Sequence, residues 1–213
     1  KKSNLNGVKF HLPNNLLKNS FNNEIRIYTD EELYCGMNQV SDTEMTVCFL
    51  ENRKQSKIPS RERLIDVIKS NKHFQKVFSD EAIEYIKSAN IYGTGNIYFG
   101  NREVVENGII MIGDAARVIS PVAGDGIGMA MESAKLLFEI ISEFGIDETN
   151  REKVYLLYKK RYEKTFQKRL STAKIIQGII LNRKSRRLGF GLAKNYPSLL
   201  PYLIKFTRNS KTA

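Results

Sequence analysis

The sequence predicts a mixed α/β fold of the α+β kind, in which an antiparallel sheet precedes a short strand, a glycine-rich helix and a helical C-terminal region. Three observations lead to this expectation. Segments with strand-like composition fill residues 8–50. Apolar residues recur at helical spacing over residues 125–144. Helical patterns also fill the last quarter of the chain, which carries a large excess of positive charge.

The composition of the chain limits the classes of protein to which it can belong. A chain of 213 residues with 41% hydrophobic content can bury a substantial core. No apolar run approaches the roughly 20 residues that span a bilayer, and the first residues, KKSNLNGVKF, lack the apolar core of a signal peptide. The expected compartment is therefore the cytoplasm. The cysteines and histidines (Cys35, Cys48, His11 and His73) form no CxxC pair or cluster, so no structural metal site is expected.

The sheet is expected from the segments GVKFHL, EIRIYT, ELYCGMNQV and MTVCFLE. The last two flank the polar sequence SDTE, which predicts a hairpin. With the tip of its turn at residues 42–43, Cys48 would lie opposite Met37. Cys35 would then lie opposite Leu50, which puts both cysteines on one face of the sheet as reduced thiols.

Serines and a threonine mark the expected helix starts. Ser60 precedes RERLIDVIKS and Ser79 precedes DEAIEYIKSA, so each is a predicted N-cap. A long helix is expected over 149–170, where Thr149 and Glu152 have the spacing of a capping box. Shorter helical pieces are expected after it, separated by glycines and prolines at 178, 189, 191, 197 and 201.

The segment GIIMIGD predicts a buried strand that ends at Ile112 and turns at Gly113. Asp114 then follows where a strand meets a loop, which is a common place for a ligand contact in an α/β sheet. Further on, the glycines of residues 124–128 open a helix whose first N–H groups have no partner within the helix. Without side chains, a flat or anionic ligand could approach these groups closely. Tight packing of the helix start against a neighbour is the alternative explanation for the glycines.

The whole string GIIMIGDAARVISPVAGDGIGMAMESAKLL resembles the second flavin-binding motif of FAD-dependent monooxygenases and of geranylgeranyl-reductase-like flavin dehydrogenases. The resemblance implies FAD as cofactor, with Asp114 on its ribityl chain and Pro121 near the isoalloxazine edge. It also implies that the helix N-terminus faces the pyrimidine end, where a helix dipole stabilises the negative charge of reduced flavin. The implied cofactor-binding residues are Gly113, Asp114, Ala115, Pro121, Gly124, Asp125, Gly126, Ile127 and Gly128.

The string ELYCGMNQVSDTEMTVCFL resembles the substrate-domain hairpin of the same family. Tyr34, Cys35 and Met37 are therefore candidates to line a substrate, with ordinary sheet packing as the alternative. Arg117 could pair with an anionic group of substrate or cofactor, or be a solvated surface residue. No catalytic side chain is named, because flavin itself carries hydride transfer.

Two departures from the family pattern favour the reductase or dehydrogenase branch. Arg117 stands where many hydroxylases have His, and Asp125 where many have Gln. A flavin-dependent monooxygenase remains the alternative within the family. The substrate is expected to be a small molecule, and a lipid-like one if the reductase resemblance holds.

The family's N-terminal GxGxxG motif is absent, and GTGNIYFG does not replace it. The sequence is therefore expected to be the C-terminal part of a longer flavoprotein, inactive without its N-terminal nucleotide-binding half. The expected division is a substrate-domain sheet with helices over 1–106, the strand and helix of the FAD motif over 107–145, and a basic helical region over 146–213.

The positive charge suggests a second function of another class. Residues 159–213 hold 15 lysines and arginines but only one acidic residue, Glu163, a net charge of +14 against +11 for the whole chain. Their mixture with apolar residues suits an anionic membrane surface, which would make this region a binding module without redox activity. A solvated basic face is the plainer alternative. No recognised nucleic-acid-binding motif accompanies the charge, so a nucleic-acid partner is not expected.

Overall fold

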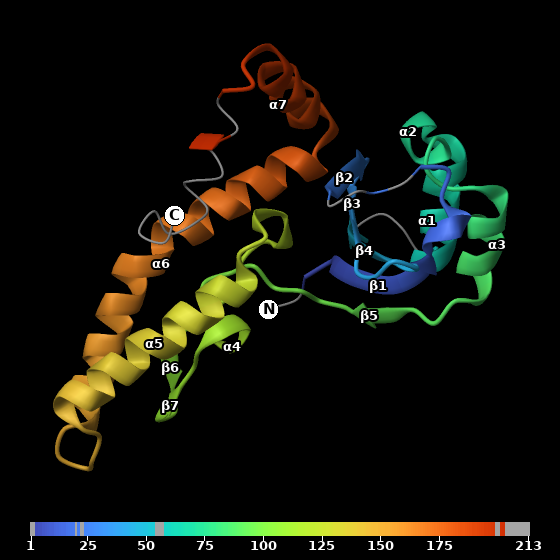
Figure 1. Cartoon of the computed structure of the whole chain (residues 1–213). Coiled ribbons are helices and arrows are strands. Elements are labelled where there is room, and N and C mark those ends of the chain that lie inside the picture. The colour runs from blue at the N-terminus through green and yellow to red at the C-terminus, as the bar shows by residue number, and fades with distance from the viewer. Residues whose placement is uncertain (1–2, 20, 22–23, 54–57, 199–200, 203–213) are drawn as a thin grey trace. The chain divides into compact units, whose positions relative to one another are not determined.

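The structure is a computed structural model that describes residues 3–19, 21, 24–53, 58–198 and 201–202 (Figure 1). The chain divides into two compact units. The first comprises residues 1–98 with 180–186, and the second comprises residues 99–179 with 187–213.

A five-stranded antiparallel sheet forms the first unit. The strands lie in the order β2-β3-β4-β1-β5, and every pair of neighbours runs antiparallel. The strands are β1 (Leu5–Pro13), β2 (Ile25–Asp30), β3 (Leu33–Gln39), β4 (Glu44–Asn52) and β5 (Tyr92–Thr94). The mixed fold with an antiparallel sheet, expected from the sequence, is confirmed.

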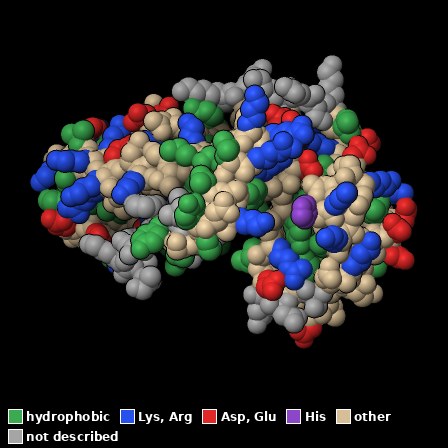
Figure 2. Space-filling view, turned by 90° about the horizontal axis from the view of Figure 1, so that it is seen from above, with side chains coloured by type: hydrophobic (Ala, Val, Ile, Leu, Met, Phe, Trp, Pro, Cys, Tyr) green, Lys and Arg blue, Asp and Glu red, His purple; other side chains and the backbone are tan. Residues whose placement is uncertain are grey.

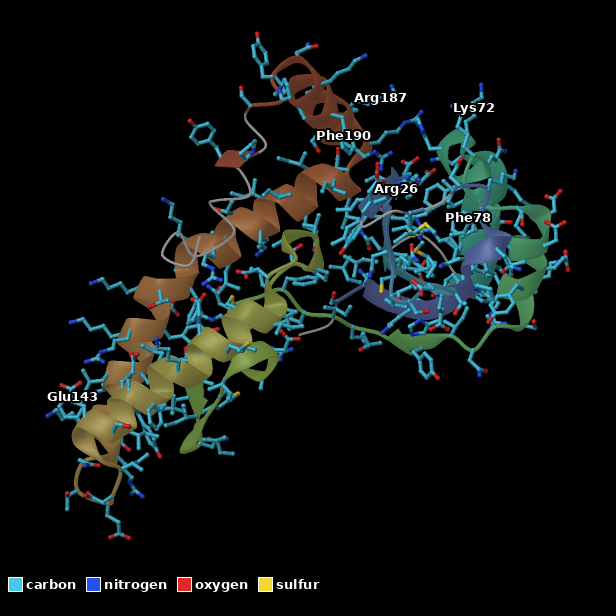
Figure 3. All side chains as sticks on the ribbon, in the orientation of Figure 1. Arg26, Lys72, Phe78, Glu143, Arg187 and Phe190 are labelled. Atoms are coloured by element: carbon cyan, nitrogen blue, oxygen red, sulfur yellow. The ribbon has the colours of Figure 1, made fainter. Side chains whose placement is uncertain are left out.

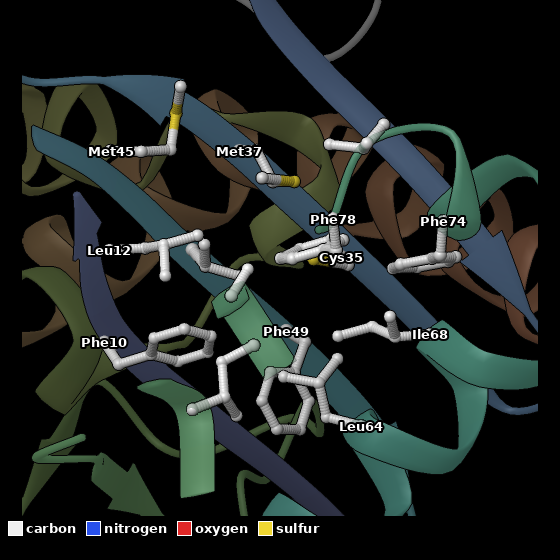
Figure 4. Packing of buried hydrophobic residues seen from close by; sticks show 14 of the residues in the cluster. Phe10, Leu12, Cys35, Met37, Met45, Phe49, Leu64, Ile68, Phe74 and Phe78 are labelled. Atoms are coloured by element: carbon white, nitrogen blue, oxygen red, sulfur yellow. The ribbon is translucent and has the colours of Figure 1, made fainter. Parts of the chain in front are cut away.

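Helices α1 (Ser60–Ser70), α2 (Lys72–Gln75) and α3 (Asp80–Ser88) pack on one face of this sheet. The core between them is built from alternate strand residues and helix residues, among them Phe10, Leu12, Cys35, Met37, Phe49, Leu64, Ile68, Phe74 and Phe78 (Figure 4). Ser79 caps α3, because its Oγ accepts a hydrogen bond from the Ala82 N–H at 3.0 Å, as predicted. The cap predicted at Ser60 is wrong: Ser60 is the first residue of α1, and its Oγ donates to Glu51.

The β3–β4 hairpin is present, but its register differs by one residue from the expected one. Cys35 pairs with Phe49 and Cys48 with Gly36, because the turn closes with the Val40 N–H donating to the Glu44 carbonyl at 3.0 Å. A one-residue shift exchanges the two faces of a strand. The prediction that both cysteines share a face is therefore wrong: Cys35 is buried and Cys48 is exposed on the other face.

The second unit begins with a two-stranded hairpin, β6 (Val105–Glu106) and β7 (Ile109–Ile110). Helix α4 (Gly113–Ala116) and the 3-10 turn Pro121–Ala123 follow, and then α5 (Gly126–Phe144). The helix predicted over 125–144 is thus confirmed, and it ends at Gly145 with φ +66°. The buried strand predicted in GIIMIGD is not observed in the described residues: β7 has two residues, and Ile109 is 64% exposed. Among the described residues β7 pairs with β6 alone. The apolar run is therefore not enclosed in a larger sheet, and its composition did not predict its exposure.

Helix α6 (Arg151–Leu181) supplies one side of the second core. Residues at intervals of three or four along it are buried, namely Val154, Tyr158, Tyr162, Phe166, Arg169, Ala173 and Gln177. The predicted capping box at Thr149 is wrong, since Oδ1 of Asp147 accepts from the N–H groups of Thr149 and Asn150 at 2.8 and 3.1 Å. Gly178 lies inside α6 rather than at its end, and α7 (Arg183–Asn195) likewise contains Gly189 and Gly191.

The observed division differs from the one expected from the sequence. The first boundary falls after residue 98 instead of 106. No boundary falls near residue 146, because the segment 104–140 and the buried face of α6 share one hydrophobic cluster. The strand and helix of the motif therefore belong to the same unit as most of α6. No helix of the described residues is long and apolar enough to cross a membrane.

Candidate functional site

The turn between β7 and α5 needs a glycine at its start. Gly113 has φ +56°, a left-handed conformation that favours glycine. Its N–H donates to Oγ of Ser133 on α5 at 2.9 Å. A Cβ atom at this position would lie 3.1 Å from Cβ of Ala130, closer than packed side chains normally approach. Gly113 therefore lets the motif turn lie directly against α5.

Asp114 and Ala115 follow on the exposed side of α4. The Asp114 carboxylate has no hydrogen-bond partner among the residues that the structure describes. An exposed carboxylate without a hydrogen-bond partner can accept hydrogen bonds from the hydroxyl groups of a ligand. The sequence predicts Asp114 directly after a buried strand, but it lies in the first turn of α4 instead. Its contact with a ligand stays a prediction.

The start of α5 presents a second set of polar groups. Pro121 opens the 3-10 turn, and Gly124 reverses the chain with φ +63° and no atom within 4 Å of the space that a side chain would fill. The N–H groups of residues 126–128 have no partner in the described part of the chain, and Asp125 in the N-cap position makes no side-chain cap. Ile127 is 81% exposed. Free amides at the positive end of a 19-residue helix form a ready site for negative charge.

Arg169 of α6 binds the first turns of α5 from the buried side. Its Nη1 donates to Oε2 of Glu132 at 2.6 Å, and its Nη2 donates to Oδ2 of Asp125. Burial opposes the charge of Arg169, but the hydrogen bonds to these two carboxylates outweigh it and raise its pKa. Of the residues predicted to bind cofactor, Asp125 thus already has a protein partner.

Two other side chains of α6 hold the motif segment. The Tyr158 hydroxyl donates to the Met111 carbonyl oxygen at 2.8 Å, just before the turn at Gly113. The Ser120 hydroxyl donates to Oε1 of Gln177 at 2.5 Å, just before Pro121. Helix α6 therefore fixes the segment at both of its bends, which gives the site a rigid support.

Arg117, a predicted substrate or anion contact, is buried and occupied. Its Nε donates to the Arg102 carbonyl at 3.0 Å, Nη1 to Oε1 of Gln167 at 3.4 Å, and Nη2 to Glu163. Arg117 is 7% exposed, so it is not a solvated surface residue. In this structure it links the motif segment to α6, and a role in substrate binding stays a prediction.

The three residues predicted to line a substrate from β3 do not lie on the same face. Cys35 and Met37 are fully buried in the core beneath α1–α3, so the prediction that they contact a substrate is wrong (Figure 4). The reason is the alternation of side chains along a strand, which places positions 35 and 37 on one face and Tyr34 on the other. Tyr34 is almost buried on that opposite face, and its role stays a prediction.

Sequence reasoning missed Arg169 and Gln177, because both were counted as part of a basic C-terminal tail. A signal for them was present in the spacing: each continues the run of buried positions that begins at Val154. A polar residue at such a position must have a partner inside the protein. Within the described residues, no group of three or more histidine, cysteine or acidic side chains could hold a metal ion.

The fold and the motif turn together define the class of protein. Over 97% of its length the chain resembles Klebsiella pneumoniae HpxO complexed with FAD and uric acid, with a TM-score of 0.66, 12% identity and 54% of that chain covered. Over 99% of its length it resembles the tetracycline destructase Tet(51), with a TM-score of 0.65, 13% identity and 56% of that chain covered. The chain therefore has the fold of the FAD-dependent oxidoreductases and monooxygenases.

Sequence comparison gives the family. The family model for squalene epoxidase matches residues 15–179, and the chain belongs to this family. A curated relative is the digeranylgeranylglycerophospholipid reductase of Methanosarcina acetivorans, 31% identical over 83 residues, which are 38% of this chain and 20% of that enzyme. The chain thus matches a fifth of the length of this relative and spans about half the length of the solved structures that it resembles.

Proposed function

We propose that this chain is the C-terminal part of an FAD-dependent oxidoreductase of the dehydrogenase or reductase type, acting on an apolar or lipid-like substrate. One observation carries the proposal: the unpaired carboxylate of Asp114 lies in the same motif segment as the free N–H groups of residues 126–128. The membership in a flavoenzyme family supports it.

The residues present fit the cofactor. Bound FAD supplies the redox chemistry. Asp114 would accept hydrogen bonds from ribityl hydroxyls, and the open start of α5 would stabilise negative charge on the pyrimidine end of the reduced ring. The open space at Gly124 would let the ring approach the backbone. These residues bind and orient the cofactor, and none of them has to act as an acid or base.

The names of the relatives support the proposed substrate class. The curated relatives are named as reductases of a digeranylgeranylglycerophospholipid, which supports a lipid-like substrate for this chain. The name of the matching family, squalene epoxidase, supports a flavin-dependent monooxygenase as the second candidate. Incubation of the reduced protein with an isoprenoid lipid, with and without oxygen, distinguishes the two candidate functions. A reductase converts the lipid without oxygen, whereas a monooxygenase requires oxygen.

An exposed apolar face on α5 supports a missing partner segment. Ile127, Met131 and Phe138 are spaced by four and seven residues, so they share one side of the helix, and all three are exposed. We propose that the N-terminal nucleotide-binding half of the protein packs against this face and completes the FAD site. The chain without that half is then expected to be inactive.

Replacement of Asp114 by alanine in the natural full-length protein tests the proposal. We expect FAD to bind at least about tenfold more weakly, since a hydrogen bond to a charged group contributes about 1.5–3 kcal/mol. Glu139→Ala is the matched control, because Glu139 is an exposed acid of α5 outside the motif turn. FAD titration followed by flavin fluorescence measures both. Wild-type protein that shows no flavin absorbance, even with added FAD, would contradict the proposed function; equal affinities would remove Asp114 from the site.

Helix α7 supports a membrane-surface role for the basic region. Leu188, which is 71% exposed, and Leu192 lie one turn apart and face outward. Arg183 and Arg187 lie one turn apart on another side of the helix, and Figure 3 shows Arg187 and Phe190 projecting from α7. Figure 2 shows Lys and Arg side chains interspersed with hydrophobic ones on the face that it presents. We propose that α7 lies at an anionic membrane surface and brings the enzyme to a lipid substrate. Residues 199–200 and 203–213 of the predicted region lie outside the described residues.

Co-sedimentation with vesicles tests this role. The full-length protein should bind vesicles that contain phosphatidylserine, and binding should weaken with salt. Leu188→Ser with Leu192→Ser should reduce binding, whereas Leu156→Ser, an exposed leucine on α6 outside the basic region, should not. Absence of binding at low salt would exclude the membrane role and leave the FAD proposal untouched.

A further inference from the structure

Ser133 is a polar residue in the interior of the second unit. It belongs to α5 and is fully buried, so its hydroxyl group needs hydrogen-bond partners inside the protein. The hydroxyl has two such partners: it donates to the Ala130 carbonyl oxygen at 2.8 Å, and Oγ accepts from the Gly113 N–H at 2.9 Å. Because its proton is used within α5, the hydroxyl acts toward Gly113 as an acceptor alone.

The Gly113 N–H needs an acceptor because it stands at the start of a helix. Gly113 is the first residue of α4, and the first N–H groups of a helix have no partner within it. A polar side chain at the preceding position often satisfies one of these groups, but that position is Ile112, which makes no side-chain cap. Ser133 therefore supplies the acceptor from another helix, 20 residues further along the chain.

This hydrogen bond matters because the backbone at Gly113 is intrinsically free. Its φ of +56° is available because glycine has no Cβ, but the same freedom lets a glycine adopt many other conformations. Helix α4 has four residues, and a single helical turn is not stable on its own. The hydrogen bond to Ser133 thus selects one conformation at the residue directly before Asp114.

The direction of the Asp114 side chain depends on that conformation. Its carboxylate is exposed and makes no hydrogen bond to the described residues, so no hydrogen bond of its own holds it in place. The backbone of α4 sets the direction in which it projects. Hydrogen bonds weaken steeply when donor and acceptor are misaligned, so a turn that is free to move would present the carboxylate poorly to a ligand.

We infer that Ser133 is a positioning residue of the FAD site: its hydroxyl fixes the turn at Gly113 and thereby directs the Asp114 carboxylate toward the cofactor. That the ligand is FAD rests on the proposed function. The hold of Ser133 on the turn does not, because it follows from the hydrogen bond between Ser133 and Gly113. Ser133 acts through Asp114 and needs no contact of its own with the cofactor.

Amide hydrogen exchange of Ser133→Ala separates this role from packing. The change removes one oxygen atom and leaves the close approach of Gly113 to Ala130 as it is, and alanine favours a helix. In the full-length protein without FAD, the Gly113 amide should exchange at least about fivefold faster, since it loses its acceptor. Ser142→Ala is the matched control, because Ser142 is an exposed serine of the same helix, and exchange at Gly113 should not change there. Unchanged exchange in Ser133→Ala would overturn the inference.

FAD binding shows whether the hydroxyl acts through Asp114. Ser133→Ala should weaken FAD binding about fivefold in the wild-type background and leave it unchanged in Asp114→Ala, because no carboxylate is then left to direct. A serine that only stabilised the fold would cause the same loss in both backgrounds, and that result would overturn the inference, as would undiminished binding in Ser133→Ala. If the wild type binds no added FAD, the proposed function fails, while exchange at Gly113 still decides whether Ser133 holds the turn.

Discussion

Tyr158 and Tyr162 lie one turn apart on α6, with ring centroids 5.8 Å apart, yet their hydroxyl groups differ in their hydrogen bonding. The Tyr158 hydroxyl donates to the Met111 carbonyl oxygen at 2.8 Å. The Tyr162 hydroxyl is buried without a partner among the described residues. Burial raises the pKa of Tyr162 to about 12, so this hydroxyl stays neutral at physiological pH.

The two tyrosines therefore predict opposite effects of losing a hydroxyl group. Tyr158→Phe should lower the free energy of unfolding by about 1 kcal/mol or more, because it leaves the Met111 carbonyl unpaired. Tyr162→Phe should leave stability unchanged or raise it by up to about 1 kcal/mol, since it removes an unsatisfied buried group. Urea unfolding of both variants beside the wild type measures the difference. A loss in Tyr162→Phe as large as that in Tyr158→Phe would show that the second hydroxyl has a partner after all.

Replacement of two glycines of the second unit by alanine should have opposite effects on stability. Gly113→Ala should destabilise the protein by about 1–3 kcal/mol, because φ is +56° and the new Cβ would crowd Ala130. Gly178→Ala should instead stabilise it by about 0.5–1 kcal/mol, since Gly178 lies inside α6 with nothing within 4 Å of the added Cβ. Thermal unfolding of the two variants checks the signs. A neutral Gly113→Ala would mean that the turn at the motif can relax.

Features of the fold that depend on neighbouring residues were predictable from the sequence, whereas those that depend on residues far apart in the chain were not. The sheet, α3 with its Ser79 cap, and α5 with its ending at Gly145 were all predictable, because alternation, caps and helix-ending glycines act within a few residues. The register of the β3–β4 hairpin was not. It depends on whether two or three residues close the turn, and SDTE is compatible with both.

The candidate site shows the same limit. Asp114 and the amides of residues 126–128 were predictable because one continuous motif contains them. The partners of Asp125 and Arg117 were not, since Arg169 lies 44 residues and Glu163 46 residues further along the chain. Only the packing of α6 brings them together. The net charge of residues 159–213 concealed this, because a count of charges does not distinguish a buried arginine from a solvated one.

The corrected hairpin register predicts that the two cysteines differ in reactivity. Burial raises the pKa of both thiols, but Cys35 lies in the core of the first unit whereas Cys48 is exposed on the other face of the sheet. A raised pKa lowers the fraction of reactive thiolate at any given pH. At pH 8 a thiol reagent should therefore modify Cys48 slowly and leave Cys35 unmodified in the native protein. Both should react in denaturant. Mass spectrometry of labelled peptides measures each site, and Cys48→Ala is the control that should abolish native labelling. Equal native labelling of both cysteines would mean that they share one accessible face, as the register with residues 42–43 at the tip requires.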